Sequence, residues 1–73
     1  MEELKKMLES RYPHIDFDAE KHLIGNGVLD SAEVVVIIAE IEELFDISIT
    51  MEYINQDNFE SLEAMWEMIE ELQ

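Results

Sequence analysis

The sequence is poor in the residues that interrupt or cross-link a chain. Among its 73 residues there is no cysteine, one proline and two glycines. The lack of cysteine excludes a disulfide framework and a thiolate metal site. No window of about 20 apolar residues occurs, so we expect no membrane-spanning helix. The first ten residues also lack the apolar stretch of a signal peptide, and we therefore expect a cytoplasmic location.

Positive charge is equally scarce. Four Lys and Arg stand against 19 Asp and Glu, which gives a formal net charge of −15. Binding to nucleic acid or to an anionic membrane surface requires clustered basic residues, so the charge argues against nucleic acid and disfavours an anionic membrane surface as partners. The chain is nevertheless 48% hydrophobic, enough for a small core below an acidic surface. Its length predicts a single domain over residues 1–73 with little room for an enclosed catalytic cleft.

The few helix-breaking residues lie close together. Pro13, Gly25 and Gly27 all fall between positions 13 and 27, which predicts one long irregular segment over residues 12–30. Its scattered apolar residues indicate that this loop packs onto the core, and loops of this length are often functional. Before it, Leu4, Met7 and Leu8 follow a helical spacing that predicts a helix over residues 2–11.

A second helix is predicted over residues 31–45. Asp30 followed by Glu33 matches the capping-box pattern that begins helices. The β-branched run 34–38 would also suit a strand, but the cap and the helical continuation to Phe45 favour a helix. The expected core-facing stripe of this helix consists of Val35, Ile38, Ile41, Leu44 and Phe45.

The C-terminal third predicts one short and one longer helix. A single helical turn is expected around residues 51–54, and Ser61 is the expected cap of a last helix. The fold class is therefore all-α, with three main helices, one short helix and a long loop between the first two. We expect most of the core to come from Val35, Ile38, Ile41, Phe45, Leu62, Trp66 and Ile69.

Ser31 is the residue best placed for chemistry. It would be the first helical residue after the cap Asp30, beside backbone N–H groups that have no helical partner. A phosphate ester on its hydroxyl would lie at the positive end of the helix dipole. Gly25 and Gly27 would let the preceding loop approach the serine closely. This pattern alone is also typical of an ordinary helix start.

Three segments give the sequence a family resemblance. Residues 27–31 (Gly-Val-Leu-Asp-Ser), 42–49 (Glu-Glu-Leu-Phe-Asp-Ile-Ser-Ile) and 58–65 (Asn-Phe-Glu-Ser-Leu-Glu-Ala-Met) together resemble acyl carrier proteins. The resemblance extends over nearly the whole chain and is strongest from Leu23 to Ile49. It implies a four-helix bundle with 4'-phosphopantetheine attached to Ser31, and an acyl or aminoacyl group carried as a thioester. It also implies a non-catalytic, monomeric protein in which the missing thiol is supplied by the prosthetic group.

The resemblance further implies which partners dock and where. They are a phosphopantetheinyl transferase and loading or acyl-transfer enzymes with basic patches, which meet the helix after the serine. The acidic candidates on or just after this helix are Glu33, Glu40, Glu42, Glu43 and Asp46. Complementary charge would mainly speed the encounter and suppress wrong partners. Glu33 is the strongest candidate because it lies nearest to Ser31.

Two positions depart from the family pattern. Ala32 stands where a bulkier apolar residue is usual, and Val36 stands where carriers of fatty-acid synthesis usually have an acidic residue. These residues are four apart and share a helix face near Ser31, where they add to the expected docking surface. The less charged face favours a D-alanyl, other aminoacyl, peptidyl or specialised acyl cargo over an ordinary fatty-acyl one.

Other interpretations remain open. An unmodified acidic helical adaptor for a basic partner would have a similar composition. A metal site built from His14, Asp16, Asp18 and His22 is not expected, because their spacing matches no standard site. A serine hydrolase would need an oriented base and an oxyanion hole. We do not expect one here, because the chain has only two histidines and little room for a cleft. If the protein shelters its cargo, Leu29, Val35, Phe45 and Ile49 are the expected lining.

Overall fold

The computed structural model describes residues 1–73 and contains three α-helices and no strands. The helices are α1 (Glu2–Arg11), α2 (Ser31–Phe45) and α3 (Leu62–Leu72). The all-α prediction is confirmed, and the bounds of α1 and α2 agree with those expected. The short helical turn expected near residue 51 is a 3-10 turn, η1 (Met51–Tyr53), and a second one, η2 (Asp57–Phe59), was not predicted.

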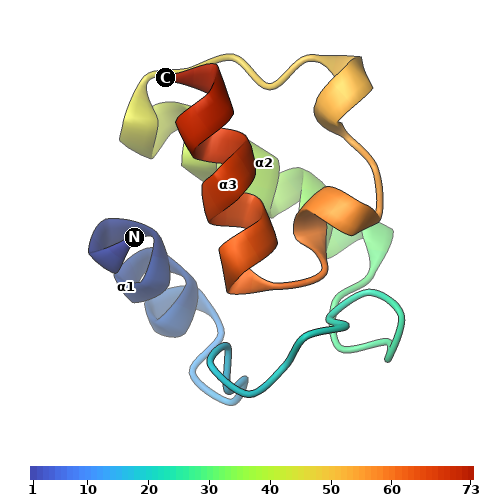
Figure 1. The fold of residues 1–73 in the computed structure, drawn as a ribbon. Helices are drawn as coiled ribbons and strands as arrows, with labels where there is room; N and C mark the ends of the chain where they lie inside the picture. The colour runs from blue at the N-terminus through green and yellow to red at the C-terminus, as the bar shows by residue number, and fades with distance from the viewer.

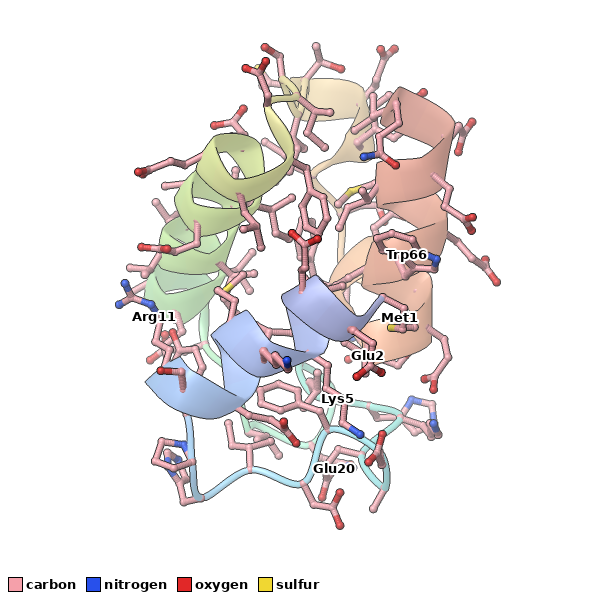
Figure 2. The ribbon with its side chains drawn as sticks, turned by 90° about the vertical axis from the view of Figure 1, so that its left-hand side faces the viewer. Met1, Glu2, Lys5, Arg11, Glu20 and Trp66 are labelled. Carbon is pink, nitrogen blue, oxygen red and sulfur yellow. The ribbon has the colours of Figure 1, made fainter.

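The helices enclose a core that the long loop completes. Figure 2 shows α1 lying across the gap between α2 and α3. The loop 12–30 runs along one end of the molecule to the start of α2, where η2 also lies (Figure 1). The predicted packing of this loop is confirmed, because five of its side chains are buried: Tyr12, Ile15, Phe17, Leu23 and Leu29. The loop is therefore a part of the folded core, although it contains no helix.

Fifteen residues are buried and all of them are hydrophobic. Of the predicted core, Ile41, Leu62 and Ile69 are buried, whereas Ile38, Phe45 and Trp66 pack against the core while partly exposed. The rings of Phe45 and Trp66 meet edge to face, with centroids 5.8 Å apart. Since no polar side chain is buried, burial of apolar surface is the main source of stability.

The prediction that Val35 belongs to the core is wrong. Its side chain is 64% exposed, and Leu44 is also exposed, whereas Ile37 and Ile41 are the buried residues of α2. Residues 34–38 are all aliphatic, so the periodicity alone does not distinguish one helical face from the next. Packing against α1 and α3 selects the face that carries Ile37 and Ile41, and Val35 turns outward.

Three ion pairs tie separate parts of the chain together. Lys5 in α1 pairs with Asp18 in the loop at 2.8 Å, and Lys21 in the loop pairs with Glu63 of α3 at 2.9 Å. Arg11 reaches from α1 to Glu40 of α2, with 2.6 Å between Nη2 and Oε1 (Figure 2). Three of the four basic residues are thus used within the molecule. None of the helices has the length and apolar character needed to cross a membrane.

Candidate functional site

Ser31 is exposed at the first position of α2, where a complete capping box begins the helix. The Asp30 carboxylate accepts the Glu33 N–H at 2.9 Å, and the Glu33 carboxylate accepts the Asp30 N–H at 3.2 Å. This confirms the predicted cap. The Ser31 hydroxyl forms no side-chain hydrogen bond, so it is available for substitution at a fixed helix start.

An apolar cavity of about 320 Å³ opens beside Ser31. This volume lies at the lower end of the range for small-molecule sites. Ser31, Asn55 and Gln56 are the polar residues of its lining. The apolar lining comes from the loop, from α2 and from the segment 54–59: Ile24, Val34, Val35, Ile38, Ile54 and Phe59. A substituent on Ser31 would therefore have an apolar surface directly beside it.

The structure corrects the lining expected from the sequence. Val35 lines the cavity, but Leu29 and Ile49 are buried in the core. Phe45 packs against Trp66, more than three turns of α2 away from Ser31. The prediction failed because Ile24, Ile54 and Phe59 lie on segments that only the tertiary fold brings to Ser31.

The carboxylate of Glu60 anchors the loop that leads to Ser31. One of its oxygens, Oε1, accepts the N–H groups of Ile24 at 2.7 Å and Gly25 at 2.9 Å. The other, Oε2, accepts the side-chain amide of Gln56 at 3.1 Å. These hydrogen bonds, led by the one from Gly25, hold the pKa of Glu60 below the ordinary value for a glutamate. Sequence reasoning missed this role, because the partners are 35 and 36 residues apart.

The two glycines serve different needs. Gly27 has a φ of +73°, a left-handed conformation that glycine adopts without strain. Gly25 lies against the Glu60 carboxylate, where an added Cβ would be 3.1 Å from Oε2. The close approach at Gly25 is thus to Glu60, and the expected close approach of the loop to Ser31 stays a prediction.

The outer face of α2 near Ser31 is almost uncharged. Ala32, Val35, Val36 and Ala39 are all exposed there. The first ionisable residue that is both exposed and without an internal partner is Glu43, three turns after Ser31. The departures at Ala32 and Val36 therefore belong to a continuous apolar surface, which we call the α2 outer face (Ala32, Val35, Val36 and Ala39).

Most acidic docking candidates are already engaged within the molecule. Glu33 completes the capping box, Glu40 pairs with Arg11, and Glu42 accepts the Ile49 N–H at 2.8 Å. Glu43 and Asp46 are exposed and form no side-chain hydrogen bond or ion pair. The docking roles of Glu33 and Glu40 remain predictions. Both carboxylates already bind groups within the molecule, so a partner would have to bind them in addition to these groups.

The structure does not assemble the weaker candidate sites. No group of three or more His, Asp or Glu residues is placed to hold a metal ion, and His14 and His22 are both exposed. Asp16 instead caps a turn of the loop by accepting the N–H groups of Asp18 and Ala19. Comparison with protein-family models, with curated proteins and with solved structures finds no match to this chain.

Proposed function

We propose that this protein is a carrier protein of the acyl-carrier type, with Ser31 as the attachment residue for 4'-phosphopantetheine. The observation that carries the proposal is the exposed, unbonded hydroxyl of Ser31 at the capped start of α2, beside an apolar cavity. The resemblance of residues 27–31, 42–49 and 58–65 to acyl carrier proteins supports it. A four-helix bundle of that family, with η1 and its flanking residues as the short helix, is part of the proposal.

The residues around Ser31 suit a phosphodiester and an attached apolar group. Unpaired N–H groups at the start of a helix favour a negatively charged phosphate. The prosthetic group would supply the thiol that carries cargo, in a chain without cysteine. Asp30 holds the helix start, and the apolar lining of the cavity offers a surface against which an apolar chain could pack. The protein itself catalyses no step.

Partner enzymes would meet the α2 outer face. These are a phosphopantetheinyl transferase and the enzymes that load or use the cargo. Apolar contact with Val35 and Val36 would form the centre of the interface, while Glu43 and Asp46 would attract basic residues at its edge. An apolar centre favours an aminoacyl, peptidyl or specialised acyl cargo over that of a fatty-acid synthesis carrier.

The proposal is tested by intact-mass measurement after incubation with coenzyme A and a broad-specificity phosphopantetheinyl transferase. We expect a single addition to the wild-type protein and to Ser10→Ala, a control at another exposed serine. Ser31→Ala should gain no mass. An unchanged wild-type mass, or an addition that survives Ser31→Ala, would contradict the proposal. The first outcome would favour the alternative, an unmodified acidic adaptor for a basic partner.

A further inference from the structure

Glu60 connects the two sides of the cavity beside Ser31. On one side, Ile24 lines the cavity and its N–H donates to Glu60 Oε1 at 2.7 Å. On the other side, Gln56 lines the cavity and its amide donates to Glu60 Oε2 at 3.1 Å. The Glu60 side chain is only 15% exposed, and no other single side chain bonds to both sides. We call this arrangement the Glu60 clamp (Ile24, Gly25, Gln56 and Glu60).

The clamp does more than link the loop to the segment between η2 and α3. The backbone carbonyl of Glu60 already holds the loop by accepting the Leu23 N–H at 2.8 Å. The carboxylate also accepts the next two N–H groups, those of Ile24 and Gly25. These two hydrogen bonds orient the backbone on both sides of the Ile24 side chain. Hydrogen bonds to a carboxylate are stronger than those between neutral groups. Their loss should therefore loosen Ile24 and Gly25 while the Leu23 bond remains.

We propose that Glu60 is a positioning residue, whose carboxylate keeps Ile24 and Gln56 in place so that the cavity beside Ser31 accepts a short apolar chain. Use of the cavity by a cargo rests on the proposed function. The shape of the cavity does not, because it belongs to the unmodified protein. The ionisable group that the structure places against the carboxylate is the His22 imidazole, whose Nδ1 lies 3.8 Å from Oε2.

The experiment compares the unmodified wild type with Glu60→Gln, Glu60→Ala and Glu63→Gln. Glu63→Gln is the matched control, because it also removes one charge and breaks a contact between the loop and α3. Amide hydrogen exchange reports the clamp, and methyl NMR during titration with hexan-1-ol reports the cavity. Both measurements are made at temperatures where each variant is folded by circular dichroism.

We expect the Ile24 and Gly25 amides to exchange about tenfold faster in Glu60→Gln and faster still in Glu60→Ala. The Leu23 amide should change much less, because its acceptor is a backbone oxygen. The methyl shifts of Ile24 and Ile38 should report hexan-1-ol binding that is several-fold weaker in both Glu60 variants. Glu63→Gln should behave as the wild type in both measurements.

Three results would overturn the proposal. The first is equal exchange rates of the Ile24 and Gly25 amides in Glu60→Gln and in Glu63→Gln. The second is faster exchange of these amides with unchanged affinity for hexan-1-ol. The third is that hexan-1-ol does not bind to the wild type. A failure of Ser31 to accept phosphopantetheine would count against the proposed function alone, since the clamp is measured without modification. The two proposals can therefore fail independently.

Discussion

At the scale of single residues, the side chains around Ser31 act mainly through backbone groups. Asp30 and Glu33 satisfy N–H groups at the start of α2, and Glu60 satisfies those of Ile24 and Gly25. Carboxylates that accept such bonds are favoured in their charged form. Acidic residues such as Glu60 therefore stabilise the structure in addition to making the surface negative.

The Glu60 clamp predicts a pH dependence with a definite sign. Hydrogen bonds from Gly25, Gln56 and Ile24 lower the pKa of Glu60 in the folded state, so its contribution to stability is complete above the unfolded-state pKa, about 4.3. That contribution is lost as the pH falls through the lower folded-state pKa. The difference in melting temperature between the wild type and Glu60→Gln should therefore have its full size at pH 7 and shrink towards pH 3.

Circular dichroism melts at a series of pH values provide the measurement. Glu67→Gln is the control, because Glu67 is exposed on α3 and forms no side-chain hydrogen bond or ion pair, so it reports removal of one negative charge. A constant difference between the wild type and Glu60→Gln over the whole pH range would show that the carboxylate bonds do not stabilise the fold.

At the scale of elements, α2 shows how far a helix can be predicted from its own residues. Its bounds and its capping box follow from local chemistry, since Asp30 and Glu33 interact within one turn. Its buried face does not, because the aliphatic run 34–38 offers several faces of similar hydrophobicity. Contact with α1 and α3 buries Ile37 and Ile41 and leaves Val35 at the cavity and on the surface.

The orientation of α2 predicts unequal costs for two truncations. Ile41→Ala should lower the free energy of unfolding by about 2–5 kcal/mol, because it removes fully buried methyl groups. Val35→Ala should change it by less than about 0.5 kcal/mol, because the side chain is exposed and alanine favours helix. Urea unfolding measures both. Equal costs, or a larger cost for Val35→Ala, would contradict this orientation of the helix.

At the scale of the whole molecule, the excess of negative charge is the dominant feature. A net charge of −15 is confined to a chain with a radius of gyration of 11.1 Å. Three of the four basic residues lie in exposed or half-exposed ion pairs, and such pairs contribute about 0–1 kcal/mol each. Repulsion between the remaining carboxylates therefore opposes folding more than the ion pairs offset it.

This balance predicts that salt stabilises the fold. Raising sodium chloride from about 0.02 M to 0.5 M shortens the screening length from over 20 Å to well below the size of the molecule. We expect the melting temperature to rise by roughly 5 °C, which corresponds to about 1 kcal/mol for a domain of this size. Differential scanning calorimetry measures the shift. A flat response, or a fall, would show that the three ion pairs outweigh the repulsion.

The sequence alone determined the features that depend on neighbours along the chain: the all-α class, the bounds of α1 and α2, the caps at Asp30 and Ser61, and the exposed serine after the long loop. Only the tertiary structure decided the buried face of α2, the cavity beside Ser31 and the Glu60 clamp. The physical reason is the distance along the chain between the residues that interact. Caps and helical periodicity act over one or two turns, whereas the cavity and the clamp join residues of the loop, α2 and the segment 54–60 through packing that no local pattern records.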